Sequence, residues 1–92
     1  METVWHLYIL RCGDGSLYTG ITTDVHRRFY AHQLGKGAKY TRGRGPLELV
    51  YQECCGSHSA ALKREIQVKG LSREDKLRFL KEEANRAEGK SV

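Results

Sequence analysis

Five side chains that can transfer protons or bind ions occur in order along this chain: Tyr8, Tyr18, Arg28, His32 and Glu65. A phenol has an unperturbed pKa of about 10, so a tyrosine exchanges its proton near neutral pH only when neighbouring groups tune it. A guanidinium group stabilises anionic oxygen, an imidazole accepts or donates a proton, and a carboxylate can hold a divalent cation. Whether these groups act together depends on the elements that position them.

Two short apolar runs near the start of the chain flank a glycine-rich turn. The runs are residues 4–11 and 17–22, and the segment between them reads CGDGS. Runs of this kind, separated by a few glycine and aspartate residues, predict two antiparallel strands joined as a β-hairpin. The hairpin would carry both tyrosines.

The loop length decides whether the two tyrosines share a face of the hairpin. With the loop at residues 13–15, Leu10 lies opposite Tyr18. Tyr8 then lies opposite Gly20, and because side chains alternate between the faces of a strand, both tyrosines and the glycine lie on the same face. A loop one residue shorter would shift the pairing and break this arrangement, so the register is a hypothesis.

The segment after the hairpin predicts a helix near 25–34. Asp24 precedes it and is a favoured N-cap residue. Arg28 and His32 are three and seven residues after Val25, so they share a helical stripe with that apolar side chain. A cation and an imidazole on the core-facing side need a reason, and the tyrosine face of the hairpin is the nearest candidate.

Three further elements complete the predicted fold: a strand near 47–54, and helices near 59–69 and 73–84. The strand would complete a small three-stranded antiparallel sheet flanked by helices, which is an α+β fold. Residues 1–84 would form a single domain, and residues 85–92, where the apolar periodicity is lost, would fray as a C-terminal tail.

Glu65 borders the side of its helix that is expected to face the core. Leu62 and Ile66 mark the predicted inward stripe, and Glu65 is three residues after the first and directly before the second. A carboxylate in such a place destabilises the fold unless it is paired or bound to a metal ion. The plain alternative is an ion pair with an arginine or with Lys69, one turn further along.

Length, cysteine content and hydropathy restrict the class of protein. The chain has 92 residues and three cysteines, two of them adjacent, with no CxxC pair. This pattern argues against a disulfide framework and a zinc site, and it favours a reducing cytoplasm. No apolar run approaches the length of a membrane span, so we expect a soluble cytoplasmic protein.

The positive charge is concentrated in one segment of a chain whose net charge is +5. Residues 25–47 hold six basic residues and no Asp or Glu, whereas the rest of the chain holds ten basic and eleven acidic residues and nets −1. Within this segment, residues 35–46 read GKGAKYTRGRGP, which predicts an exposed loop. An anionic polymer would select such a patch, although a solvated basic surface is the ordinary alternative.

The order of these landmarks resembles the GIY-YIG nuclease domain. The tripeptide HLY, ending at Tyr8, stands where that family has Gly-Ile-Tyr, and YTG, beginning at Tyr18, stands where it has Tyr-Ile-Gly. The family's later landmarks are an arginine, a histidine or tyrosine one turn on, and a glutamate on a later helix, and they match Arg28, His32 and Glu65. The resemblance covers roughly residues 4–80 and is closest to the short single-domain bacterial members. Five landmarks in order are more specific than either motif alone.

The resemblance implies an endonuclease that hydrolyses phosphodiester bonds with one divalent ion, Mg²⁺ or Mn²⁺, held by Glu65. It implies that Arg28 contacts the scissile phosphate, that Tyr18 is the general base for the attacking water, and that Tyr8 helps to place the water or the phosphate. His32 would be the imidazole that tunes Tyr18. The expected substrate is DNA rather than RNA, in DNA repair or processing.

Further contacts to nucleic acid are expected from the hairpin and from the basic segment. Gly20 would keep the space beside the tyrosines open for the backbone of the nucleic acid. Tyr40 could stack on a base, as aromatic residues do in single-strand binders. The expected phosphate contacts are Arg27, Lys36, Lys39, Arg42 and Arg44.

The sequence departs from the family pattern in several places. His6 and Thr19 replace the first and the middle residue of the two motifs, respectively. No asparagine lies between Glu65 and Asn85, where many family enzymes carry one, so Lys69 or backbone groups would have to substitute for it. Larger members also carry a DNA-recognition domain, for which this chain has no room. Cleavage would then depend on nucleic-acid structure or on a partner protein.

Two other functions stay open on the sequence alone. One is a non-catalytic nucleic-acid-binding module that keeps the fold and the basic loop. The other is a protein-interaction domain whose basic patch meets an acidic partner. An inward-facing Glu65 favours the enzyme, because a module that only binds nucleic acid has no need for a carboxylate there.

Overall fold

The computed structural model of the chain describes residues 3–89, with side chains described up to residue 83. Three strands form one antiparallel sheet in the order β2-β1-β3, and they are β1 (Trp5–Arg11), β2 (Leu17–Thr22) and β3 (Glu48–Gly56). The helices are α1 (Val25–Gln33), α2 (His58–Lys69) and α3 (Arg73–Gly89), with a 3₁₀ turn at Lys39–Thr41. The predicted α+β architecture is therefore confirmed.

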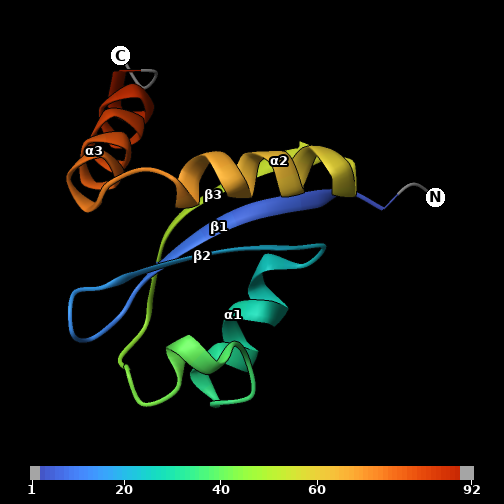
Figure 1. Ribbon diagram of the computed structural model, residues 1–92, viewed down its shortest axis with the longest axis vertical. Helices are drawn as coiled ribbons and strands as arrows, with labels where there is room; N and C mark the ends of the chain where they lie inside the picture. Colours follow the sequence, from blue (N-terminus) through green and yellow to red (C-terminus); the bar gives the residue numbers. More distant parts are fainter. Residues whose placement is uncertain (1–2, 90–92) are drawn as a thin grey trace.

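The sheet is a middle layer with a helix on each face (Figure 1). On one face, Leu7 and Ile9 of β1 pack with Val68 of α2. On the other face, Tyr8 and Leu10 pack with the first residue of α1, a valine. Because β1 is the central strand, both of its faces are buried, which explains why its sequence is a nearly continuous apolar run.

The hairpin register is the one predicted with the longer loop. Leu10 pairs with Tyr18, and Tyr8 pairs with Gly20. The turn is closed by a hydrogen bond in which the Cys12 N–H donates to the Ser16 carbonyl at 2.8 Å. The two tyrosines therefore lie on the face that α1 covers, and their rings are 6.2 Å apart between centroids.

The ends of α1 follow from local sequence. The Oδ1 atom of Asp24 accepts a hydrogen bond from the Arg27 N–H at 3.1 Å, as expected of an N-cap. At the other end, Gly35 adopts a left-handed conformation with φ +75°, and the Lys36 N–H donates to the Ala31 carbonyl at 2.9 Å. This pair of features is a Schellman ending, which fixes the direction in which the basic loop leaves the helix.

The inward face of α2 differs from the prediction. Leu62 and Ile66 are exposed, with relative accessibilities of 40% and 71%, whereas Ala61 and Val68 are buried. Small Ala61 lets the helix approach the sheet closely, so the buried stripe is rotated relative to the one that hydrophobicity alone marks. Glu65 is four residues after Ala61 and three before Val68, so this rotation places it on the inward side.

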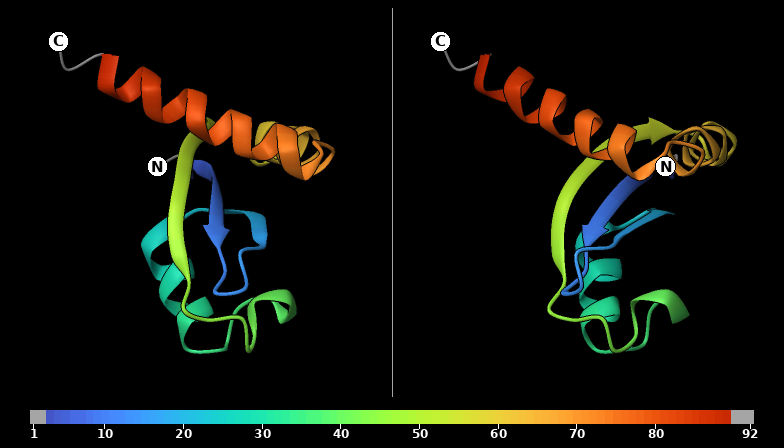
Figure 2. Two further views of the ribbon diagram at one scale, coloured as in Figure 1. Left: turned by 90° about the vertical axis from the view of Figure 1, so that its left-hand side faces the viewer. Right: turned by 60° about the vertical axis from the view of Figure 1, so that its left-hand side comes forward.

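The last helix is longer than predicted and stands partly away from the sheet (Figure 2). It is capped by Ser72, whose Oγ accepts a hydrogen bond from the Asp75 N–H at 3.1 Å. Phe79 anchors it through an edge-to-face contact with Tyr51 of β3, at 5.0 Å between centroids. The helix continues to Gly89, so the predicted loss of helix after residue 84 is wrong up to that point. Residues 90–92 of the predicted tail lie outside the described residues.

Within residues 3–89, no helix combines the length and the apolar character that crossing a membrane requires.

Candidate active site at the edge of the sheet

Tyr8 occupies the space that its glycine partner leaves open. Its side chain is 1% exposed, and a Cβ atom built on Gly20 would lie 2.6 Å from the Tyr8 hydroxyl oxygen. Only glycine therefore fits opposite this tyrosine. The expectation that Gly20 leaves room for a nucleic-acid backbone is corrected, because the tyrosine already fills that room.

His32 is held on both sides of its ring. Its Nε2 atom lies 2.8 Å from the Tyr8 hydroxyl, and its Nδ1 atom lies 3.0 Å from the Thr41 hydroxyl. The Nδ1 atom also accepts a hydrogen bond from the Ala38 N–H at 3.2 Å. A backbone N–H can only donate, so Nδ1 carries no proton and the proton of the neutral ring lies on Nε2, where it is donated to Tyr8.

The imidazole therefore serves Tyr8 and not Tyr18, which corrects the predicted partner. With Tyr18 the ring of His32 makes only an edge-to-face contact, at 5.3 Å between centroids. The sequence could place the histidine on the inward stripe of α1, but both tyrosines lie on the facing strands. Side-chain depth decides between them, because buried Tyr8 reaches the histidine while Tyr18 points toward the sheet edge.

Burial keeps this pair of side chains in its neutral form. It raises the pKa of Tyr8 to about 12, with a further contribution from nearby Tyr18, and the Arg28 guanidinium counteracts part of that rise. Burial also lowers the pKa of His32, and the positive charge of Arg28 lowers it further. At neutral pH, Tyr8 keeps its proton and His32 carries no charge. Arg28 is the cation close to both.

Tyr18 lies on the edge strand β2, where it lines a cavity of about 420 Å³. Its ring stacks with that of Tyr40 from the basic loop, at 5.9 Å between centroids. The cavity is lined by Leu17, Tyr18, Thr19, Tyr40, Lys69 and Lys76. Of the two motif tyrosines, Tyr18 is the one in the cavity wall and Tyr8 lies behind it.

Glu65 approaches the same edge from α2. Its side chain is 20% exposed, and its Oε2 atom lies 3.4 Å from the Lys69 Nζ atom, which makes the ion pair named above as the plain alternative. Lys69 in turn lines the cavity beside Tyr18. The ion pair thus joins the inward carboxylate of α2 to a lysine that lines the same cavity as the half-buried Tyr18.

Glu65 can act as one ligand of a divalent cation, but its surroundings in the described part of the chain do not form a site in which protein side chains supply all the ligands. Among the described residues, no group of three or more His, Cys, Asp or Glu side chains could hold a metal ion. Mg²⁺ in nucleotide and nucleic-acid sites is commonly held by one or two carboxylates, with waters and substrate phosphates completing its shell. A single half-buried carboxylate beside an open cavity is compatible with that arrangement.

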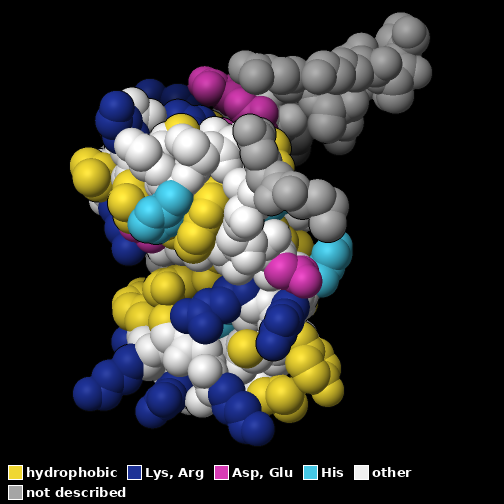
Figure 3. Space-filling view, turned by 90° about the vertical axis from the view of Figure 1, so that its right-hand side faces the viewer, with side chains coloured by type: hydrophobic (Ala, Val, Ile, Leu, Met, Phe, Trp, Pro, Cys, Tyr) yellow, Lys and Arg dark blue, Asp and Glu magenta, His cyan; other side chains and the backbone are white. Residues whose placement is uncertain are grey.

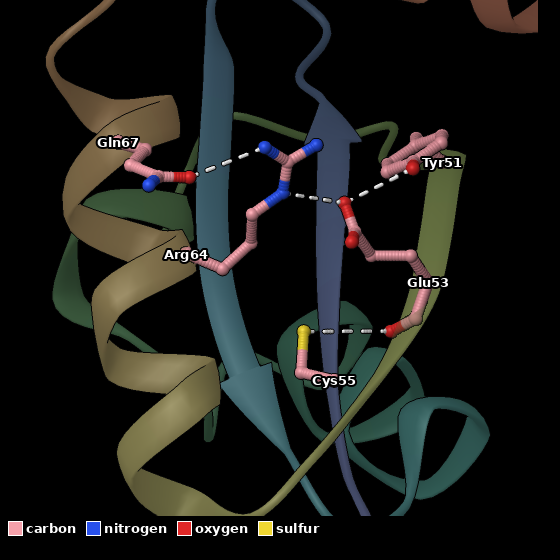
Figure 4. A network of polar contacts seen from close by, with 5 residues as sticks. All are labelled: Tyr51, Glu53, Cys55, Arg64 and Gln67. Atoms are coloured by element: carbon pink, nitrogen blue, oxygen red, sulfur yellow. Dashed lines mark hydrogen bonds and ion pairs between the residues drawn. The ribbon is translucent and has the colours of Figure 1, made fainter.

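The orientation of α2 is set by a polar network on β3 (Figure 4). Glu53 accepts hydrogen bonds at its Oε1 atom from Arg64 Nε and from the Tyr51 hydroxyl, both at 3.0 Å. Burial and the adjacent carboxylate raise the pKa of Tyr51 to about 12, so this donor keeps its proton. Because Arg64 directly precedes Glu65, the network holds the turn of α2 that presents the candidate metal ligand.

Most of the predicted phosphate contacts are exposed, as their role requires. Lys and Arg side chains gather on the half of the molecule that holds α1 (Figure 3), and the exposed members are Arg27, Lys36, Lys39 and Arg42. Arg44 differs, because its guanidinium pairs with Asp14 at 2.6 Å and lies 4.3 Å from the centre of the Tyr40 ring. Its charge is therefore partly neutralised within the protein.

The basic loop is anchored rather than loose. Thr41 is buried against His32, and the Gly13 N–H of the hairpin turn donates to the Arg44 carbonyl at 2.5 Å. Tyr40 already stacks on Tyr18, so it presents a ring to the cavity as part of an aromatic pair. Sequence reasoning missed Thr41 and Lys76, because neither carries a local pattern that points to a distant partner.

Comparisons with known proteins identify the family of this chain. Residues 4–78 match the model of the GIY-YIG catalytic domain. A UPF0213 protein of Streptococcus sanguinis is 52% identical over 87 residues, which cover 95% of this chain and 100% of the relative. The solution NMR structure of a UPF0213 protein from Bacillus halodurans has 51% identity and a TM-score of 0.57, covering 85% of this chain and 83% of that one. An NMR structure of a protein from E. faecalis has 40% identity and a TM-score of 0.60, with 88% of each chain covered. This chain therefore belongs to the GIY-YIG catalytic domain family.

Proposed function

We propose that this protein is a metal-dependent endonuclease that hydrolyses phosphodiester bonds in DNA. The observation that carries the proposal is the convergence at the edge of β2. Tyr18 and Lys69 line one cavity, and Lys69 lies 3.4 Å from Glu65. Tyr18 and Glu65, two of the landmarks shared with the nuclease family, are thus linked through Lys69 at this edge, which supports the proposal.

The two tyrosines have different tasks in this proposal. Tyr18 lies in the cavity wall and is the general base that accepts a proton from the attacking water. Tyr8 keeps its proton because its pKa is raised to about 12. One lone pair of the Tyr8 oxygen accepts the proton of His32, so the hydroxyl proton of Tyr8 is free to be donated toward Tyr18.

His32 is a positioning residue in this scheme. It is buried and bonds Tyr8 rather than anything in the cavity, so it acts by fixing which way the Tyr8 hydroxyl points. Arg28 lies close enough to Tyr8 for its charge to act on that hydroxyl. Its half-buried guanidinium is the group that would contact the scissile phosphate and offset the charge that builds up in the transition state.

Glu65 would hold the divalent cation. When bound there, the cation supplies positive charge for the phosphoryl and leaving oxygens. Lys69 orients the carboxylate until a substrate arrives. Lys69 is one turn beyond Glu65. There it would take the place of the asparagine that many family enzymes carry after the glutamate, and it would add a positive charge.

The pathway proposed for this activity is DNA repair or processing, with Mg²⁺ or Mn²⁺ as cofactor, in the cytoplasm. The exposed cations on the α1 half of the molecule support nucleic acid as the partner, because phosphate contacts supply most of the sequence-independent affinity. A partner protein would supply sequence or site specificity.

The second candidate is a module that binds nucleic acid without cutting it. The ion pair between Glu65 and Lys69 favours it, since a carboxylate with a structural partner needs no metal ion. The basic loop would serve either function.

The deciding experiment incubates the purified chain with end-labelled single-stranded, duplex and branched DNA, in Mg²⁺, in Mn²⁺ and in EDTA. Glu65→Gln is compared with Glu82→Gln, which changes an exposed carboxylate on α3. Cleavage that requires the metal and is lost only in Glu65→Gln is the expected result. Binding without cleavage, equal for all three proteins, would establish the second candidate instead.

A further inference from the structure

The cavity at the edge of β2 has a cationic rim that the hydrolytic roles above leave partly unused. Lys69 and Lys76, from two different helices, line it together with the aromatic pair Tyr18 and Tyr40. Its volume of about 420 Å³ lies within the range of small-molecule sites, which is about 300–1,000 Å³. Positive charge beside stacked aromatic rings is the combination that binds phosphate together with a base.

Lys76 has no local structural reason to be where it is. It lies near the start of α3, where the helix dipole does not stabilise a cation, and it makes no ion pair with any residue in the described part of the chain. The acidic side chains of the same turn, Glu74 and Asp75, pair instead with Arg78. The charge of Lys76 is therefore available to a ligand in the cavity.

Other groups around the cavity support an anionic ligand. The side chain of Arg73 reaches the hairpin turn, 3.8 Å from where a Cβ atom of Gly15 would be, and adds a third cation along this edge. Thr19, in the cavity wall, has a buried hydroxyl without a hydrogen-bond partner among the described residues. The acidic group beside the cavity, Glu65, is already paired with Lys69. The cavity thus carries net positive charge beside its aromatic wall.

We propose that this cavity binds one unpaired nucleotide of a single strand, next to the phosphate that is cut. Lys69 and Lys76 hold its phosphate, and the base contacts the part of Tyr40 that stays exposed (43% of the residue) beside the Arg44 guanidinium, which lies 4.3 Å from the ring centre. This inference rests on the proposed function and names the substrate class of the same site. A base paired within a duplex cannot enter, so the cavity selects single-stranded or unpaired segments.

The test measures binding in EDTA, where no cleavage occurs, by the fluorescence anisotropy of labelled single-stranded dT12 and of a duplex of equal length. Lys76→Gln is compared with Lys81→Gln, which removes an exposed lysine from the same helix outside the cavity. We expect Lys76→Gln to weaken binding of the single strand about 5- to 10-fold and to reduce the salt slope by about 0.7, the value for one phosphate contact on a single strand. Tyr40→Ala should weaken it by about 5- to 100-fold through lost stacking.

The inference is overturned if Lys76→Gln and Lys81→Gln have equal effects, or if the duplex binds as tightly as the single strand and loses as much in Lys76→Gln. A competition with inorganic phosphate separates a bare anion site from a nucleotide site. Phosphate would displace the labelled strand from a bare anion site, and Tyr40→Ala would then bind the strand as tightly as the unchanged protein. These results do not depend on catalysis. If the protein cleaves DNA but Lys76→Gln binds the single strand normally, this inference alone is wrong. If the protein prefers the single strand, loses that binding in Lys76→Gln and does not cleave, only the proposed hydrolysis is wrong.

Discussion

The two faces of the sheet differ in how their polar side chains are satisfied, by neutral hydrogen bonds on one face and by ion pairs on the other. On the face that α1 covers, Tyr8, His32 and Thr41 are buried and bond one another as neutral groups. On the face that α2 covers, the polar groups Glu53 and Arg64 lie at the border of an apolar core and pair as ions. Hydrogen-bonded neutral side chains can be buried without removing a charge from water. An ion pair is less costly where solvent still reaches its two charges.

This difference assigns the two faces different parts of the proposed function. The α1 face holds its protonation state over a wide range of pH, because burial moves both the tyrosine and the histidine pKa away from neutrality. On the α2 face we expect the ion pairs to be sensitive to salt and to ligands, because their charges are partly exposed. The hydrogen-bonded pair Tyr8 and His32 lies on one side of the edge of β2, and the ion pair of Glu65 and Lys69 lies on the other. Tyr18 lines the cavity at that edge.

The largest expected effect separates the two tyrosines. Tyr18→Phe should lower the rate of DNA cleavage by about 10²- to 10⁴-fold, the usual contribution of a general base, while leaving the melting temperature nearly unchanged. Tyr8→Phe should lower stability by about 1 kcal/mol, because His32 loses its buried partner, and reduce the cleavage rate less. Single-turnover cleavage and thermal unfolding of both variants check this. An equal loss of rate in both would contradict the division of tasks.

The next effect tests the packing of the α1 face. Gly20→Ala should destabilise the fold by about 2–3 kcal/mol, because the new methyl group would collide with the Tyr8 hydroxyl 2.6 Å away. Gly35→Ala should cost about 1 kcal/mol, since its φ of +75° disfavours alanine but nothing lies within 4 Å of the added atom. Urea unfolding of the two variants gives the comparison. Similar losses would mean that Tyr8 moves aside freely.

A smaller effect tests the ionic side. Arg64→Met keeps the length of the side chain but leaves Glu53 without its cation, so we expect a loss of about 1–2 kcal/mol. Arg27→Met, at an exposed position of α1, should change stability by less than about 0.5 kcal/mol. If Arg64 holds the turn that presents Glu65, its variant should also need more Mg²⁺ for half-maximal cleavage. A change in stability with an unchanged metal requirement would limit the network to a structural role.

The smallest effect concerns pH. The pKa of His32 is lowered in the folded state from its ordinary 6.5, so its unfolded form takes up a proton first as the pH falls. Stability should therefore be retained above pH 6.5 and decline below it, with a slope of at most about 1.4 kcal/mol per pH unit for one proton. His32→Gln should flatten this slope below pH 6.5, and His26→Gln, an exposed control, should keep it. An unchanged slope in His32→Gln would show that other groups cause it.

At high pH the tyrosines make stability fall as the pH rises, which is the opposite of the dependence expected from His32. The pKa values of Tyr8 and Tyr51 are both raised from 10.0 to about 12, so the unfolded chain loses these protons first. Stability should fall as the pH rises above about 10. Tyr51→Phe should remove part of that decline without affecting the acid side, as measured by thermal unfolding across pH 9–11.

The sequence by itself predicted the strands and helices of this protein and named most of the residues of its candidate site. Period-two and helical patterns, turn glycines and helix caps act over a few residues, so local chemistry suffices to place β1, β2, α1 and the side on which Arg28 and His32 lie. The sequence left two hairpin registers open, and the structure has the one with the longer loop, in which Tyr8 pairs with Gly20.

Only the tertiary structure decided which groups meet. Helix α2 turns its alanine and not its leucine toward the sheet, because close packing outweighs the hydrophobicity of single residues. The imidazole of His32 reaches Tyr8 because Tyr8 is the deeper of the two rings, and Lys76 joins Lys69 because the turn after α2 brings the start of α3 to the edge of β2. Depth and the direction of neighbouring helices are set by contacts between distant residues, which no local pattern records.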